Sequence, residues 1–301
     1  MRQDTASRRE ATPPRLERVE RRSGLDRDRF AAGYRRPGRP VVLTDVASRW
    51  PAMARWTPEF FRAHYGDLEV PVYAGVGHGA GYLSPVAHMR FADYLDRLMS
   101  GPVDLRLFLF NLLAQAPELR ADYSEPPLME RFARRAPPFF FGGETAHVPL
   151  HHDIDLAHLF RAQVFGVCRV ILFPPSESPW LYRHPFTVRS YVDVDRPDDV
   201  RHALFRRARG YEVVCSPGDL LYMPSGFWHD VTYLSAGWAL TLRAPPAGLP
   251  RLLGLRNVAV LLPIDRLMNR VAPEAWFAWK EKSAGRRARR SRPGRRPGQE
   301  P

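Results

Sequence analysis

The chain has 301 residues, of which 45% are hydrophobic, and a formal net charge of +13. This length and composition exclude a disordered protein and predict one main domain with appendages. Its only cysteines are Cys168 and Cys215, which excludes a disulfide scaffold and fits a reducing compartment. Because the sequence has neither a long apolar run nor a signal-peptide pattern, we expect a cytoplasmic protein without a membrane span.

Both ends of the chain are rich in arginine. We expect residues 1–22 to form a basic flexible N-terminus and residues 283–301 to form a disordered basic tail, because Arg clusters alternate there with Gly and Pro. Such a tail either is merely solvated, which we favour, or contacts nucleic acid or an acidic partner. Between these ends, the sequence divides into a domain at 23–248 and a helical segment at 249–282.

The first half of the domain mixes helices and strands. A short buried strand is predicted at RPVVLTDV, and a helix follows in which Thr57 is the N-cap, Pro58 the first helical residue and Gly66 the residue past the end. A strand at LEVPVYAG and an amphipathic helix at MRFADYLDRLMSG come next. The run LRLFLFNLL fits either a buried strand or a buried helix, and residues 115–138 are predicted to be irregular.

The second half of the domain, residues 138–244, consists of short strand-like pieces separated by turn signals such as SPGD and PSG. This pattern predicts a β-sandwich or barrel. Helical spacing returns at 249–282, where Pro263 and Pro273 are expected to break the segment into pieces.

One stretch, HVPLHHDIDLAHLF at 147–160, holds four His and two Asp. In an extended segment, His151 and Asp153 lie on one face and His152 on the other. A third ligand must come from elsewhere, and His229 in GFWHDV is the candidate. Two His and one carboxylate on one side of an ion are typical of non-haem Fe(II) oxygenases, because three coordination positions stay open. Asp155 lies on the same face as Asp153 and is the alternative carboxylate.

Two long segments strengthen this interpretation. PLHHDIDLAHLFRAQVFGVCRVILFPP and GYEVVCSPGDLLYMPSGFWHDVTYLSAGWALTLRA, together with VVLTDVASRWPAMARWTPEFFRAHYGD, resemble the cupin-like, JmjC-type family that includes the asparaginyl hydroxylase acting on hypoxia-inducible factor. The resemblance covers about residues 15–250. It implies a mainly β fold, a double-stranded β-helix with N-terminal α/β elements and C-terminal helices. It also implies Fe(II) bound by His151, Asp153 and His229, with 2-oxoglutarate as cosubstrate.

The sequence departs from the family at two positions. Cys168 stands where relatives have the Lys that holds the far carboxylate of 2-oxoglutarate, and Val148 stands where relatives often have Thr. Because a buried carboxylate needs a partner, another cation must replace that Lys. Alternation turns Arg169 to the opposite face, so we expect Arg243 in the strand LTLRA to bind the carboxylate.

The preferred hypothesis is a 2-oxoglutarate-dependent Fe(II) oxygenase that uses O₂ to hydroxylate a protein side chain or a small molecule. The alternative is a non-catalytic cupin that binds a metal or ligand, or serves as an interaction module; Cys168 and Val148 favour it. A histone demethylase is a narrower option that no reader domain in the sequence supports. Relatives in this family dimerise through C-terminal helices, so a homodimer is expected.

Overall fold

The computed structural model describes residues 13–75, 84–108, 110–133 and 138–291. Its β-strands in these ranges are β1 (Arg15–Arg18), β2 (Glu20–Arg22), β3 (Val41–Leu43), β4 (Glu69–Ala74), β5 (Ala87–Arg90), β6 (Leu105–Leu107), β7 (Phe139–Gly142), β8 (His147–His151), β9 (His158–Phe165), β10 (Cys168–Phe173), β11 (Arg209–Cys215), β12 (Leu220–Met223), β13 (Trp228–Tyr233) and β14 (Gly237–Ala244). Its α-helices are α1 (Arg27–Phe30), α2 (Ala52–Arg55), α3 (Pro58–Tyr65), α4 (Phe91–Met99), α5 (Leu112–Gln115), α6 (Leu249–Arg256), α7 (Leu262–Val271) and α8 (Pro273–Arg290).

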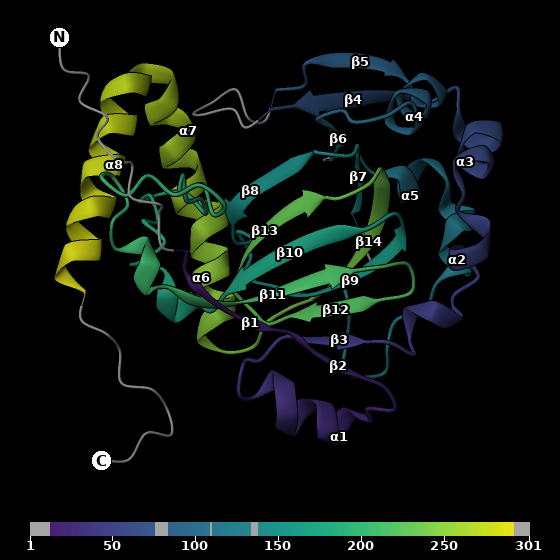
Figure 1. Cartoon of the computed structure of the whole chain (residues 1–301), viewed down its shortest axis with the longest axis horizontal. Coiled ribbons are helices and arrows are strands. Elements are labelled where there is room, and N and C mark those ends of the chain that lie inside the picture. Colours follow the sequence, from purple (N-terminus) through teal and green to yellow (C-terminus); the bar gives the residue numbers. More distant parts are fainter. Residues whose placement is uncertain (1–12, 76–83, 109, 134–137, 292–301) are drawn as a thin grey trace, which may run out of the picture.

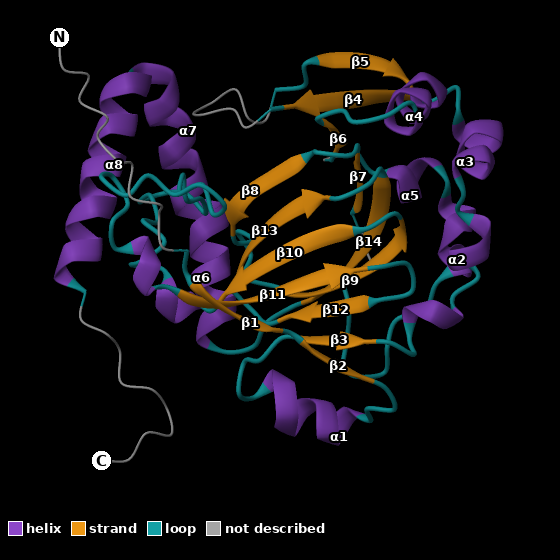
Figure 2. Cartoon of the chain, in the orientation of Figure 1, coloured by secondary structure: helices purple, strands orange, loops and turns teal. Residues whose placement is uncertain are grey.

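The strands form two sheets in the centre of the molecule (Figure 2). The smaller sheet has the order β1-β11-β10-β13-β8, and the larger one has the order β2-β3-β12-β9-β14-β7-β6-β4-β5. Alternate residues of β10 separate the layers: Val170 and Leu172 pack between the sheets, whereas Ile171 and Phe173 pack on the outer face. The predicted mainly β, jelly-roll-like barrel is therefore confirmed.

The N-terminal elements cover the outer face of the larger sheet, away from the C-terminal helices (Figure 1). Helix α3 begins and ends as predicted, because the Thr57 hydroxyl accepts a hydrogen bond from the Phe60 amide at 3.2 Å and Gly66 follows the last turn. The ambiguous run at 105–113 contains a strand, β6, and then the start of a short helix, α5.

The N-terminal segment is more ordered than expected. Residues 1–12 lie outside the described residues, but β1 pairs in parallel with β11, and β2 pairs in parallel with β3. Val19, between these two strands, is buried in the core between the sheets. The predicted flexible segment at 1–22 is therefore wrong for residues 15–22, because their backbone bonds to the edge strands of both sheets.

The C-terminal helices form the other end of the molecule (Figure 1). Pro263 does not break the helical segment as predicted, because a π-helical stretch at Asn257–Leu261 joins α6 to α7 just before it. Pro273 does separate α7 from α8. The predicted disordered tail at 283–301 is wrong for residues 283–290, which belong to α8; residues 292–301 lie outside the described residues.

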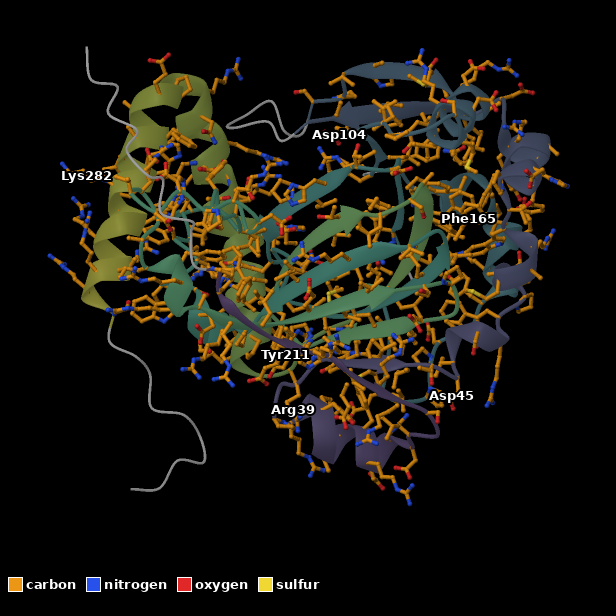
Figure 3. The ribbon with its side chains drawn as sticks, in the orientation of Figure 1. Arg39, Asp45, Asp104, Phe165, Tyr211 and Lys282 are labelled. Atoms are coloured by element: carbon orange, nitrogen blue, oxygen red, sulfur yellow. The ribbon has the colours of Figure 1, made fainter. Side chains whose placement is uncertain are left out.

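Helix α8 extends to Arg290 because one face of it is apolar. Ala284 and Ala288, four residues apart, are buried against Phe173 and Trp228 on the outer face of the smaller sheet. Its other face is basic, and Lys282 lies on the side of α8 away from the barrel (Figure 3). No helix among the described residues is long and apolar enough to cross a membrane.

Candidate metal centre and cavity

Three predicted ligands meet at one end of the barrel. His151 is the last residue of β8, Asp153 follows it, and His229 lies opposite His151 on the neighbouring strand β13. Their candidate ligand atoms all lie within 4.8 Å of one another, and Nε2 of His229 is 3.9 Å from Oδ1 of Asp153. Asp155, the alternative carboxylate, is not part of this group; its carboxylate accepts a hydrogen bond from Nη2 of Arg243.

Local backbone structure positions His229. The turn before β13 places Gly226 at φ 72° and closes with a hydrogen bond from the Phe227 amide to the Pro224 carbonyl at 3.2 Å. Glycine adopts this left-handed conformation without strain. The strand then alternates, so Trp228 packs in the outer core and His229 faces the barrel interior.

Backbone carbonyls orient both imidazole rings. Nδ1 of His151 lies 2.8 Å from the Pro149 carbonyl, and Nδ1 of His229 lies 3.3 Å from the Phe227 carbonyl. Since a carbonyl only accepts, each Nδ1 carries the proton and each Nε2 keeps its lone pair. This is the arrangement of histidine ligands in metal proteins, where the second ring nitrogen is held by an outer group.

The protonation states also suit a metal. Burial and the neighbouring His229 lower the pKa of His151 to about 3, and burial lowers the pKa of His229. Burial alone would raise the pKa of Asp153, but Arg243 and the two histidines outweigh it and hold the pKa at about 2. Near neutral pH the site therefore presents two neutral imidazoles and one carboxylate, a donor set that fits Fe(II).

Arg243 has a different role from the predicted one. It lies beside the ligands, but Nη1 donates to Asp153 and Nη2 donates to Asp155, each at 2.5 Å. Both forks of the guanidinium are therefore in use within the protein. Arg243 orients the metal-binding carboxylate and links it to Asp155.

A cavity of about 990 Å³ adjoins the triad. His151, Asp153, Val148 and Tyr233 line it on the barrel side, and residues of α7 and α8 line it on the other side. The lining also includes aromatic side chains from the larger sheet and nearby loops. A space of this size holds a cosubstrate together with part of a larger substrate.

Arg161, in the middle of β9, is a residue that sequence reasoning missed. It is only 4% exposed and faces the barrel interior, like its strand neighbour Leu159. Its Nη1 donates to Gln163 Oε1 at 2.6 Å and to the Cys168 sulfur at 3.1 Å. Nη2 is buried without an acceptor at hydrogen-bond geometry among the described residues. An arginine within the strand LFRAQVF was the available signal, because charged residues are rarely buried without function.

Cys168 and Arg169 occupy opposite faces of β10, as predicted. Cys168 is buried inside the barrel next to the Arg161 guanidinium. Arg169 forms ion pairs with Glu212 and Asp195. The Arg161 guanidinium thus lies beside Cys168, the residue that stands where relatives have the lysine.

The remaining histidines of the motif have structural partners. His147 pairs with the buried Asp230 at 2.8 Å, and the His152 ring contacts Trp228 edge-on at 4.7 Å between centroids. His158 lies 2.9 Å from the Tyr222 hydroxyl. None of the three belongs to the triad among the described residues.

Comparison with known proteins agrees with this geometry. The sequence profile of the family described as "Cupin-like domain" matches residues 27–244. The chain is similar to lysine-specific demethylase JMJ30 of Arabidopsis thaliana, with 30% identity over 72% of this chain and 52% of the relative. It is also similar to lysine-specific demethylase 8 of Danio rerio, with 28% identity over 71% of this chain and 55% of the relative.

A third relative is tRNA wybutosine-synthesizing protein 5 of Gallus gallus, with 26% identity over 73% of this chain and 74% of the relative. The chain therefore spans about half the length of the two demethylases and most of the third protein. All three residues of the triad lie within the matched range of 27–244. The chain belongs to the cupin-like, JmjC-type family of Fe(II)- and 2-oxoglutarate-type proteins.

Proposed function

We propose that the protein is an Fe(II)- and 2-oxoglutarate-dependent oxygenase that hydroxylates a protein side chain or a small molecule. The observation that carries this proposal is the cluster of His151, Asp153 and His229 beside the cavity, in a barrel that also encloses the Arg161 guanidinium, with which no carboxylate pairs among the described residues. When bound, Fe(II) with 2-oxoglutarate supplies the oxidising power for O₂ activation.

The protein's own residues hold and orient the reactants. His151 and His229 present Nε2 lone pairs, and Asp153 presents a carboxylate that Arg243 keeps ionised and fixed. Three ligands on one side leave positions for the cosubstrate and O₂. The apolar interior around Val148 keeps water away from them.

Arg161 supplies the counter-charge for the far carboxylate of 2-oxoglutarate. In β14, Arg243 lies opposite Leu159, and Thr241 lies opposite Arg161. Arg161 is thus two residues, about 7 Å, farther along the barrel than the level of Arg243. An elongated dicarboxylate with one end at the triad therefore has a buried guanidinium at its other end, whose Nη2 has no hydrogen-bond acceptor among the described residues and is available to the carboxylate.

Anaerobic titration of 2-oxoglutarate into the Fe(II)-loaded protein tests the proposal. We expect a weak visible charge-transfer band that saturates with 2-oxoglutarate and is absent in His151→Ala, which lacks an iron ligand. O₂-dependent formation of succinate should follow. Iron binding without the band would contradict the proposal and favour the alternative, a non-catalytic cupin that binds a metal or another ligand.

We also propose that the C-terminal helices pair two copies of the chain. Exposed apolar side chains follow α6 and α7, namely Leu249, Leu252, Leu255, Leu267 and Val271, each at least 60% exposed. Such a row on two consecutive helices is typical of an interface. Sedimentation equilibrium should give a dimer mass for the wild type and a monomer mass for L252E/L267E.

A further inference from the structure

One side of the cavity is strongly basic. The loop between β10 and β11, together with α7 and α8, contributes five cationic side chains to its lining: Arg183, Arg189, Arg266, Arg270 and Lys280. The acidic residues that line the cavity are Asp153 and Asp265. Each is already paired, Asp153 with Arg243 and Asp265 with Lys280. Of the five, Arg183, Arg266 and Arg270 form no ion pair with an acidic residue among the described lining residues.

Arg183 is a partly enclosed member of the group. It is half-buried, and its Nε is enclosed without a hydrogen-bond acceptor among the described residues. The charges that act on its guanidinium are those of Arg287 and Arg256, and burial together with this repulsion lowers the pKa of Arg183. Since such crowding of like charges is unfavourable, an anion bound there would stabilise it.

Arg266 and Arg270 extend the positive charge along α7. They are four residues apart, so they lie on one face of the helix about one turn from each other. Both are exposed, and neither forms an ion pair within the described part of the chain. We refer to Arg183, Arg266 and Arg270 as the basic wall. Arginine forks match the oxygens of a phosphate group.

The adjoining part of the cavity is aromatic. Its lining includes Phe108, Phe110, Phe140, Phe186 and Tyr191. Planar rings bind well between such side chains, and stacking on nucleobases does not depend on base identity. The basic wall lines the same cavity as the candidate ligands His151 and Asp153.

We propose that the substrate contains a nucleotide unit, either free or within a single-stranded nucleic acid. Its phosphate binds the basic wall, and its base enters the aromatic part of the cavity toward His151 and Asp153. This inference deepens the proposed oxygenase function and rests on it for the chemical step, in which the target atom is on the inserted base or sugar. The phosphate contacts themselves need neither iron nor 2-oxoglutarate.

Fluorescence anisotropy with the full-length, metal-free protein tests these contacts. The probe is a fluorescein-labelled single-stranded RNA of twelve nucleotides, and the competitors are adenosine monophosphate and a poly-glutamate peptide of equal length. The test variants are R183Q and R266Q/R270Q. The matched control is R36Q/R97Q, which removes the same charge as the double variant from two exposed arginines near α1 and on α4, away from α7 (Figure 1).

We expect R266Q/R270Q to weaken RNA binding at least tenfold and to reduce the slope of log Kd against log salt by about 1.4, since each phosphate contact with a single strand contributes about 0.7. The control should change Kd less than twofold. R183Q should act in the same direction. If R183Q does not fold, R266Q/R270Q still tests the proposal, because both side chains are exposed and their replacement should not affect folding.

The competitors identify the source of the phosphate. Displacement of RNA by adenosine monophosphate supports an inserted nucleotide of a strand, and binding of adenosine monophosphate without RNA binding supports a free nucleotide. Equal losses in the control and R266Q/R270Q would overturn the proposal, because they would show bulk charge attraction. Binding of poly-glutamate alone would also overturn it. Either failure leaves the 2-oxoglutarate band intact, so it is distinguishable from failure of the oxygenase proposal.

Discussion

Replacing Arg161 with methionine separates a functional role of this side chain from a structural one. The guanidinium is buried, and no carboxylate among the described residues pairs with it. If it binds the far carboxylate of 2-oxoglutarate, R161M removes the charge-assisted hydrogen bonds that Nη2 donates to that carboxylate. A loss of only about 2 kcal/mol from these bonds raises the Kd for 2-oxoglutarate about thirtyfold.

The same change should not weaken the fold. Gln163 keeps partners in R161M, because the Cys168 thiol donates to its Oε1 at 3.2 Å and its Nε2 donates to the Phe165 carbonyl at 2.7 Å. A buried guanidinium without a carboxylate partner has a desolvation cost that methionine, an apolar side chain of similar length, does not have. We therefore expect an unchanged or higher Tm together with weaker binding.

Two measurements on one variant decide the matter. The charge-transfer band under anaerobic conditions gives the Kd for 2-oxoglutarate, and calorimetry of the metal-free protein gives Tm. R169M is the control, since Arg169 pairs with Glu212 and Asp195 on the opposite face of β10, and its Kd should equal that of the wild type. A lower Tm with an unchanged Kd would refute the reasoning and make Arg161 a structural residue.

Three further predictions follow from the site and its surroundings. In R243Q, the charge that lowers the pKa of Asp153 is lost, so burial raises this pKa and the carboxylate is protonated more easily. Fe(II) affinity, measured by competition with a chelator, should therefore fall more at pH 5.5 than at pH 7.5. Equal losses at both pH values would contradict this. In G254A, the new Cβ would lie 2.4 Å from the Asp155 carbonyl oxygen, so calorimetry should show a destabilisation of about 1–3 kcal/mol, whereas a wild-type Tm would show that α6 can move away. Burial, followed by Lys280, lowers the pKa of His184 to about 3, below its usual 6.5, so the stability associated with the neutral ring is present above pH 6.5 and is lost as pH falls toward 3. Between pH 7 and pH 5 this loss is about 2 kcal/mol, and urea denaturation of H184Q should show a pH dependence weaker by that amount; an identical dependence would assign the effect to other groups.

Much of the barrel and the metal ligands could be predicted from the sequence because their signals are local. Alternation placed His151 and Asp153 on one face and turned Arg169 away from Cys168, and turn residues marked the start of β13 before His229. Capping residues gave the exact start of α3. These features depend on neighbours within a few residues, so a single sequence contains them.

The features that were missed depend on contacts between separate strands and loops, which the local pattern does not specify. Arg243 was placed correctly at the site, but its pairing with Asp155 is set by the register of β14 against β9 and by the loop after β8. Arg161 on β9 of the larger sheet reaches Cys168 on β10 of the smaller sheet across the barrel interior. The ordering of residues 15–22 needs two strand edges that lie far along the chain. In each case the tertiary packing determines a side-chain partner or a strand pairing that the local sequence pattern does not specify.

The α6 helix touches the loop that carries the metal-binding carboxylate. Gly254 packs against the Asp155 backbone, and the Asn257 side chain donates to the Ile154 carbonyl at 3.1 Å. The opposite face of the same helix exposes Leu252 and Leu255. A molecule that binds this outer face and shifts α6 would change the affinity of the proposed site for iron. By thermodynamic linkage, iron would then change the affinity for that molecule by the same factor, which would couple the proposed pairing of two copies to metal loading.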